Sequence, residues 1–177
     1  MKPAGLFPSL MGGEFARLAP AVQAVHGGRS LTLQGHADVV RGKSLLAQVL
    51  CLLGRLAHDQ SRCPVRVEIE VHGDREVWTR HFGASPRMRS VLTARGGTLC
   101  ERFGPAALQF ALSAEQGSVA WRPVKARVFG VPVPAGWLGE IRARACERAG
   151  VYVFDVKVAL PRVGTIIEYR GQLESPR

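Results

Sequence analysis

Residues 65–82 decide the fold, and they read Val-Arg-Val-Glu-Ile-Glu-Val-His-Gly-Asp-Arg-Glu-Val-Trp-Thr-Arg-His-Phe. Apolar and polar residues alternate on both sides of Gly73-Asp74, which is the pattern of a β-hairpin with a two-residue turn. With this turn, one face of the hairpin carries most of the apolar side chains and must point to the core: Val65, Val67, Ile69, Val71, Trp78 and Phe82. The same face also carries Glu76 and Arg80. Charged side chains on the core side of a strand indicate a functional site, although the pattern names no reaction.

The composition is that of one soluble globular domain. The chain has 177 residues, of which 46% are hydrophobic and 21% are charged, and a chain of this length buries about two-thirds of its unfolded surface. Its formal charge is +10, but the arginines are scattered along the chain, without a dense basic run or a recognition helix. A spread charge of this kind is typical of a solvated surface and argues against a nucleic-acid interface.

Cysteine and histidine spacing predicts no metal site and no cofactor. The four cysteines form no CxxC pair, which also argues against a disulfide scaffold, and the five histidines lack the spacing of metal ligands. Pro3 and Pro8 interrupt the apolar core that a signal peptide needs. The longest apolar run, residues 45–53, is too short to span a bilayer. We therefore expect a reduced, cytoplasmic protein without a membrane span.

Periodicity divides the chain into a helical start and a long β-rich remainder. We expect residues 1–13 to be a flexible lead-in, followed by a helix over 14–26 that Pro20 breaks. A strand over 31–39 contains Gly35, which suggests a bulge or a close approach of two backbones. The apolar residues of 44–57 cover more than one stripe of a helix, so this helix is expected to pack against a sheet over much of its surface.

Strands then follow one another to the end of the chain. After the hairpin they are expected over residues 88–93, 98–103, 106–112, 118–129, 141–147, 151–160 and 165–173, with a longer connection over 131–136. Short connections indicate antiparallel pairing, and closure removes exposed edges. The predicted fold is mainly β (α+β). It is a single domain over 14–177, in which an antiparallel meander of about ten strands curls into a barrel or half-barrel, with one or two N-terminal helices packed on it.

The period of two assigns a set of polar and aromatic side chains to the inner surface. They form the candidate ligand-binding set: Glu76, Trp78, Arg80, Ser90, Glu101, Glu147, Phe154 and Tyr169. Glu76 and Arg80 are four residues apart on one strand, about 13 Å at ~3.3 Å per residue, so they cannot pair with each other. Since an unpaired buried ion costs several kcal/mol, we expect Arg80 to pair with Glu101 or Glu147.

Two interpretations of this set stay open. Apolar walls with a few convergent polar groups are typical of a small-molecule pocket; alternatively, the charges are solvated at a barrel end or form one structural ion pair. Motifs for other chemistry are weak. Gly42-Lys43-Ser44 has Ala37 where a phosphate-binding loop needs Gly, and no Ser-His-Asp set can be assembled from spacing.

A series of short motifs extends over nearly the whole chain. They are Val25-His26-Gly27, Gly35-x-Ala37-x-Val39-x-Arg41-Gly42, Glu76-x-Trp78-x-Arg80-x-Phe82-Gly83, Glu101-Arg102-Phe103-Gly104-Pro105, Gly130-Val131-Pro132-Val133-Pro134, Phe154-Asp155-Val156, Leu160-Pro161-x-x-Gly164 and Tyr169-Arg170-Gly171-x-Leu173. Together they resemble the domain of unknown function 4166 family of uncharacterised bacterial domains. The resemblance implies no catalytic residue. Some members of that family are joined behind a nucleotide-binding oxidoreductase-like domain, which implies a substrate-handling or accessory role, here with a partner in trans.

Three hypotheses on function follow. The leading one is a protein that binds a small lipophilic ligand inside the barrel or half-barrel, with a polar or acidic head held by Arg80 and with Trp78, Phe154 and Tyr169 as walls. The second is an enzyme that uses Glu76, Glu101 or Glu147 as acid or base. The third is a non-catalytic accessory domain, for which an exposed apolar patch over residues 131–137 would be the sign.

Overall fold

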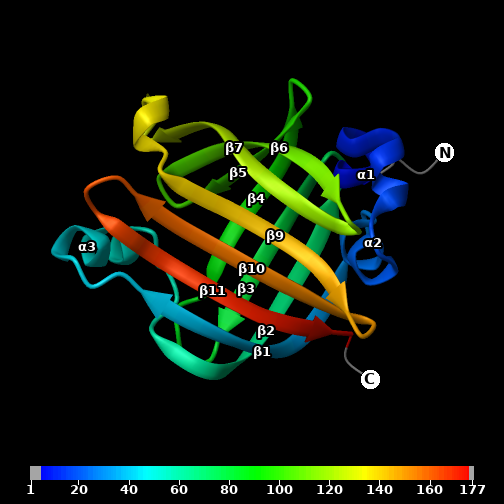
Figure 1. The fold of residues 1–177 in the computed structure, drawn as a ribbon, viewed down its shortest axis with the longest axis horizontal. Helices are drawn as coiled ribbons and strands as arrows, with labels where there is room; N and C mark the ends of the chain where they lie inside the picture. The colour runs from blue at the N-terminus through cyan, green and yellow to red at the C-terminus, as the bar shows by residue number, and fades with distance from the viewer. Residues whose placement is uncertain (1–4, 176–177) are drawn as a thin grey trace.

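The computed structural model describes residues 5–175, and Figure 1 shows a barrel of strands with helices at both of its ends. The helical segments are α1 (Leu6–Met11), the 3-10 helix η1 (Gly12–Arg17), α2 (Pro20–His26), α3 (Leu45–Leu53) and the 3-10 turn η2 (Ala135–Trp137). The strands are β1 (Leu31–Arg41), β2 (Gln60–His72), β3 (Arg75–Phe82), β4 (Met88–Arg95), β5 (Thr98–Phe103), β6 (Ala106–Glu115), β7 (Ser118–Val128), β8 (Val131–Pro132), β9 (Glu140–Arg148), β10 (Val151–Leu160) and β11 (Gly164–Glu174). Among residues 5–175, no helix has both the length and the apolar character that crossing a membrane requires.

The sheet is a closed antiparallel barrel. Neighbouring strands pair in the order β1 to β7, then β9, β10 and β11, and β11 pairs with β1 to complete the circle. The two-residue strand β8 pairs only with the end of β7 and lies outside the circle. The predicted meander is therefore confirmed, and of the two predicted forms the barrel is the one that this chain adopts. Closure leaves none of the ten strands with a free edge.

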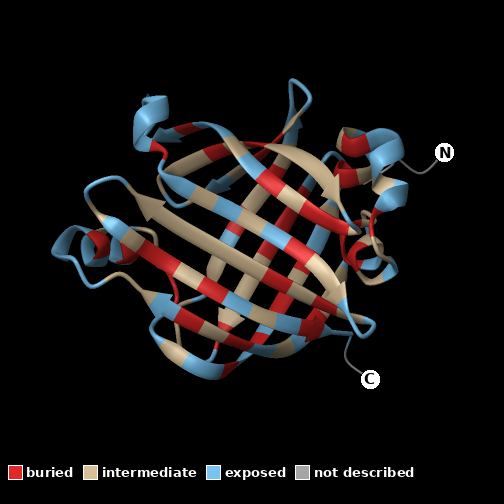
Figure 2. Ribbon diagram, in the orientation of Figure 1, coloured by how far each residue is buried: buried red, intermediate tan, exposed pale blue. Residues whose placement is uncertain are grey.

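The hairpin that decides the fold has the predicted register. Val65 pairs with Phe82, Val67 with Arg80 and Ile69 with Trp78, around a turn in which Gly73 has a positive φ of 62°. The apolar side chains of this face are buried inside the barrel, and Figure 2 shows how buried and more exposed residues alternate along the strands. The side chains of Glu76 and Arg80 consequently start from the inner face.

The first helices cover one end of the barrel, which we call the α1/α2 end. Pro20 is the first residue of α2 and separates it from η1, as the broken pattern predicted. Helix α1 lies within residues 1–13, where we expected a flexible lead-in; residues 1–4 lie outside the described residues. Phe7 of α1 is fully buried, and Leu6 and Met11 are also buried. The reason is that this short helix supplies apolar side chains to a barrel end that the strands alone leave uncovered.

Helix α3 crosses the opposite end of the barrel, which we call the α3 end (Figure 1). The prediction that this helix packs over much of its surface is wrong. Only the small side chains Ala47 and Cys51 are buried, and the Cys51 thiol donates a hydrogen bond to the Ile166 carbonyl at 3.3 Å. The large apolar side chains on its other face are exposed: Leu45, Leu46, Val49, Leu52 and Leu53. A nine-residue helix at a barrel mouth contacts strands on one side only, so an apolar pattern on two faces leaves one of them in solvent.

The seam between the first and last strands is closed by glycine. A side chain on Gly35 of β1 would overlap the backbone carbonyl of Gln172 on β11, and one on Gly171 would overlap the carbonyl of His36. The sequence prediction of a close backbone approach at Gly35 is therefore confirmed. At both positions the obstacle is backbone, which cannot swing away as a flexible side chain can.

We expect Gly35→Ala to lower the free energy of unfolding by about 2–3 kcal/mol, because the added methyl group must push β1 away from β11. Urea unfolding followed by tryptophan fluorescence measures this change. Gly136→Ala is the matched control, since a side chain there meets nothing within 4 Å, and its effect should stay within about 0.5 kcal/mol. Equal stability of the two variants would contradict a tight seam.

Candidate functional site

The α1/α2 end of the barrel is filled by a cluster of aromatic side chains. The ring of His26 lies 4.2 Å from that of Phe7, 5.4 Å from Trp78 and 5.8 Å from Tyr152, centroid to centroid, and Trp121 lies 5.5 Å from Phe7. These five side chains come from α1, α2, β3, β7 and β10 and are all buried. They seal this end, because rings from two helices and three strands pack against one another there.

His26 is a neutral member of that cluster. Its Nε2 lies 3.1 Å from the Tyr152 hydroxyl oxygen, whereas its Nδ1 has no partner among the described residues. Burial lowers the pKa of His26 to about 3 and raises the pKa of Tyr152 well above its usual range. The imidazole therefore stays uncharged over the physiological pH range.

Glu76 is enclosed next to the cluster. The indole nitrogen of Trp78 donates a hydrogen bond to Oε2 of Glu76 at 2.9 Å, while Oε1 has no partner in the described part of the chain. Burial raises the pKa of this carboxyl, and hydrogen bonds from Trp78 and the Leu6 backbone act in the opposite direction. Its side chain is buried behind α1, so a substrate has no direct path to it.

Arg80 forms a polar network further along the same strand. Its Nη1 donates to the Ser90 hydroxyl at 2.9 Å, and its Nη2 lies 3.3 Å from Oε1 of Glu101. The Arg80 guanidinium carbon also lies 5.2 Å from the centroid of the Trp78 ring. The side chains of Arg80 and Glu101 are each 13% exposed. The predicted pairing of Arg80 with Glu101 is confirmed, and the pair comes from β3 and β5.

Glu147 is separate from this network. Its Oε2 accepts a hydrogen bond from the backbone N–H of Ala21 at 2.7 Å, at the start of α2. The alternative pairing of Arg80 with Glu147 is therefore not formed, because Glu147 holds the N-terminus of a helix instead. Of the three carboxylates considered as acid or base, only Glu101 lies beside Arg80.

The remaining predicted residues, Phe154 and Tyr169, lie on the adjacent strands β10 and β11. Phe154 and Tyr169 pack 6.1 Å apart, and Tyr169 packs 5.3 Å from Phe82, ring to ring. Burial raises the pKa of Tyr169, and the charge of Arg80 lowers it, so the two side chains are electrostatic neighbours. The structure thus groups Trp78, Arg80, Ser90, Glu101 and Tyr169.

Along β9 and β10, inward-facing side chains become less buried toward the α3 end. On β10, Tyr152 and Phe154 are buried, whereas Val156 and Val158 are half-buried, and Ile141 on the adjacent strand β9 is also half-buried. All of them belong to the core or pack against it. The inner surface near the α3 end is therefore less enclosed along β9 and β10, whereas Val39 on β1 and Ile167 on β11 are each 2% exposed.

Some members of the site could not be identified from the sequence. Phe7 lies in a segment without a clear pattern, and Trp121 and Tyr152 are ordinary inward positions of their strands. His26 stands at a helix end, and nothing in the sequence marks its aromatic partners. Within the described part of the chain, no group of three His, Cys, Asp or Glu side chains is placed to hold a metal ion.

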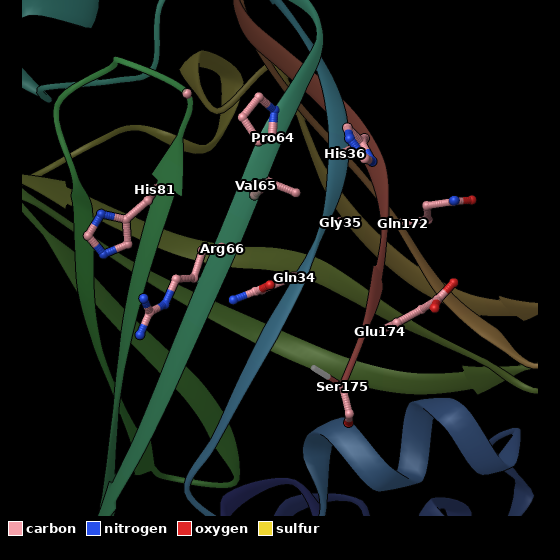
Figure 3. A pocket seen from close by; sticks show the side chains of 11 residues that line it. Gln34, Gly35, His36, Pro64, Val65, Arg66, His81, Gln172, Glu174 and Ser175 are labelled. Carbon is pink, nitrogen blue, oxygen red and sulfur yellow. The ribbon is translucent and has the colours of Figure 1, made fainter. Parts of the chain in front are cut away.

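Grooves also lie on the outside of the barrel. One of about 640 Å³ runs over β1, β2, β3 and β11 and carries His36, Arg66, His81 and Glu174, whose arrangement Figure 3 shows. A second, of about 620 Å³, lies over β5, β6 and β7. None of the eight predicted site residues lines either groove, so the inward network and the outer grooves are different surfaces.

The family model described as "Domain of unknown function (DUF4166)" matches residues 18–173. The chain belongs to this family. The match begins at Leu18, so α1 and its Phe7 lie outside the matched part of the DUF4166 domain. No curated protein shows significant sequence similarity to the chain. Among solved structures, Rv2717c from M. tuberculosis is similar with a TM-score of 0.51 at 10% identity, over 90% of this chain and 99% of that one; at this identity the likeness concerns the fold alone.

The Arg80–Glu101 pair should be energetically coupled. We expect Arg80→Met to lower the free energy of unfolding by up to about 3 kcal/mol, because Glu101 then lacks its cation inside the barrel. Glu101→Gln added to Arg80→Met should restore part of that loss. A double-mutant cycle by urea unfolding measures the coupling. The control is the outer-surface pair Arg66–Glu68, 2.8 Å apart, whose side chains are 54% and 31% exposed. It should couple by less than about 1 kcal/mol, and equal couplings would contradict an enclosed Arg80–Glu101 pair.

His26 should make the domain sensitive to acid. Its pKa is about 3 in the folded state and ~6.5 in the unfolded chain, so only the unfolded chain binds this proton between those values. The free energy of unfolding therefore falls as pH drops from about 6.5 toward 3, with a slope of up to about 1.4 kcal/mol per pH unit. His26→Gln should flatten this slope in unfolding measured at several pH values, whereas His36→Gln, at an exposed position, should keep it. Identical profiles for the two variants would contradict the assignment.

Proposed function

We propose that this DUF4166 barrel binds a small lipophilic ligand with a polar or acidic head, which enters at the α3 end. The observation that carries the proposal is the Arg80–Glu101 pair turned inward beside half-buried apolar side chains. An ion pair in a barrel interior is costly unless polar groups or water complete its hydrogen bonds. A ligand head at this position supplies such groups, and the apolar inner surface suits its tail.

The chemistry of Arg80 sets the kind of head. A guanidinium has five N–H donors, and the bonds to Ser90 and Glu101 use one each from Nη1 and Nη2. Other donors are then directed at an oxygen of the ligand, such as a carboxyl, sulfonate or hydroxyl oxygen. The partner carboxylate of Glu101 can accept a hydrogen bond from a protonated head. Trp78, Tyr169 and Phe154 supply flat apolar surface around this point.

The arrangement of the two ends supports entry from one side. The aromatic cluster fills the α1/α2 end, while inward-facing side chains such as Val156 and Ile141 are half-buried toward the α3 end. A ligand entering there would meet apolar side chains first and Arg80 last. This order suits an apolar molecule that carries its polar group at the leading end.

A binding experiment tests the proposal directly. Native mass spectrometry of the protein as purified should detect a bound small molecule, and anilinonaphthalene sulfonate, an apolar probe with an acidic head, should bind saturably. We expect Arg80→Met/Glu101→Gln to weaken probe binding at least tenfold, because the head loses its donors. The matched surface variant Arg66→Met/Glu68→Gln should change it less than twofold. No saturable binding, or equal loss in both variants, would overturn the proposal.

A second variant separates an open interior from a filled one. Val156 is half-buried on the inner face, so in an open interior Val156→Phe is accommodated and competes with the probe for space. In a filled interior the same change overpacks the core and costs about 1–3 kcal/mol. Thermal unfolding and probe titration of this variant distinguish the two cases, and destabilisation without any effect on the probe would count against an interior site.

A second candidate function, a non-catalytic interaction domain, is favoured by one observation. Val131 and Trp137 are each 65% exposed, which is the apolar patch expected of such a domain. Further exposed apolar side chains lie at the same end of the barrel. The charges around them indicate the kind of partner that this surface would bind.

A further inference from the structure

The exposed large apolar side chains are concentrated at one end of the barrel. We call the main group the apolar rim: Leu45, Leu46, Val49, Leu52, Leu53, Phe129, Val131 and Trp137. Leu45 is 82% exposed, Leu52 76% and Phe129 73%. Among residues 5–175, the other exposed large apolar side chains are Val40 near the end of β1 and Val124 and Val128 in the second half of β7.

The turn between β5 and β6 joins the two parts of the apolar rim. A side chain added at Gly104, in the turn between β5 and β6, would come within 3.7 Å of the carbonyl oxygen of Leu53 at the end of α3. The next residue, Pro105, accepts a hydrogen bond at 2.9 Å from the backbone N–H of Phe129. At its other end α3 is held by the Ser44 hydroxyl, which donates to Val163 between β10 and β11. Figure 1 shows α3 and the turn that follows β8 at the same end of the molecule, away from α1 and α2.

A basic groove adjoins the apolar rim. The outer groove of about 620 Å³ over β5, β6 and β7 is lined by four cationic side chains, Arg95, Arg102, Lys125 and Arg127, and by no acidic one. Gly104, Pro105 and Gly130 also line it, so it runs up to the contacts that hold Phe129.

Most other charges at this end have the same sign, and the exposed carboxylate of Asp59 accepts a hydrogen bond from the Arg41 backbone N–H. Exposed Lys43 and Arg55 stand before and after α3. Glu140, which follows η2, is neutralised by Lys157 at 2.6 Å and by Arg142 at 3.6 Å. The whole chain carries a formal charge of +10. The apolar rim therefore lies in a field that attracts anions.

The geometry points to the surface of an anionic lipid bilayer as the partner of the α3 end. Leucine, phenylalanine and tryptophan side chains suit the boundary between head groups and acyl chains. Cationic side chains beside them contact anionic head groups, each adding to the attraction. Nucleic acid would use the basic groove but would leave the leucines of α3 in water. The inference does not depend on the proposed ligand, because it concerns only the outer surface.

Vesicle binding tests this inference. We expect the full chain to co-sediment with phosphatidylcholine vesicles that contain about one-third phosphatidylglycerol, and at least tenfold less with phosphatidylcholine alone. Binding should weaken as salt rises from about 50 mM to about 500 mM. Leu45→Gln/Leu52→Gln should lower binding to anionic vesicles at least tenfold, because both side chains are removed from the acyl boundary. Leu45→Phe/Leu52→Phe should keep it, and both pairs should fold, since these positions are exposed.

Charge variants complete the test. Arg102→Gln/Lys125→Gln/Arg127→Gln should also reduce binding at least tenfold, whereas Arg66→Gln/Arg75→Gln/Arg148→Gln, which removes the same charge from exposed positions elsewhere, should change it less than threefold. Equal binding to both kinds of vesicle overturns the inference. The inference is also overturned if free glycerophosphate or an oligonucleotide abolishes vesicle binding and the leucine variants bind vesicles as well as the parent protein does. Self-association lost in Leu45→Gln/Leu52→Gln, without vesicle binding, would assign the apolar rim to a second copy instead.

Discussion

Pairing of the first strand with the last, β1 with β11, is the constraint on which the rest of the structure depends. It runs from Gln34–Glu174 to Arg41–Ile167 and is close enough that Gly35 and Gly171 have no room for a side chain. Once this seam is formed, every strand has two neighbours and the sheet has an inside. Residues that would be one face of an open sheet then surround an enclosed volume, and the Arg80–Glu101 pair, which joins β3 to β5 on one wall, lies inside it.

The two ends of the enclosed volume differ in how they are covered. At one end, short helices bring Phe7 and His26 onto Trp78, Trp121 and Tyr152, and a carboxylate of the barrel, Glu147, holds the start of α2. At the other, α3 covers the barrel with the small residues Ala47 and Cys51 and leaves its leucines outside. The inner surface is therefore covered by large aromatic side chains at one end and by small side chains at the other. The ligand proposal depends on how the inner surface is covered at the α3 end, whereas the lipid-surface inference depends only on the leucines that α3 leaves outside.

Local pattern predicted much of the fold and part of the site. A period of two is enough to assign inner faces, so the register of the hairpin, the inward direction of Arg80 and Glu101, and their pairing were accessible from the sequence. Closure of the barrel was harder to predict from the sequence, because the pairing of β1 with β11 joins residues more than a hundred positions apart. Glu147 shows a related limit: its partner is a backbone N–H of α2, and no side-chain pattern marks such a group.

The helices account for the remaining differences. Helix α1 has no periodic signal, since six residues make fewer than two turns, and its importance lies in one side chain, Phe7. The apolar pattern of α3 was recognised, but apolar residues around a helix look the same whether a sheet or solvent faces them. Burial of Leu45 and Leu52 was therefore expected where exposure is found.

The claim at the centre of this account is that space not filled by side chains lies next to the Arg80–Glu101 pair. A high-resolution crystal structure of the protein under xenon pressure measures this most directly, because xenon binds apolar space that side chains leave empty. We predict density for xenon, ordered water or a carried ligand between Arg80, Tyr169 and Val156. If side chains fill this part of the interior, with no density for xenon, water or a ligand, the claim is contradicted.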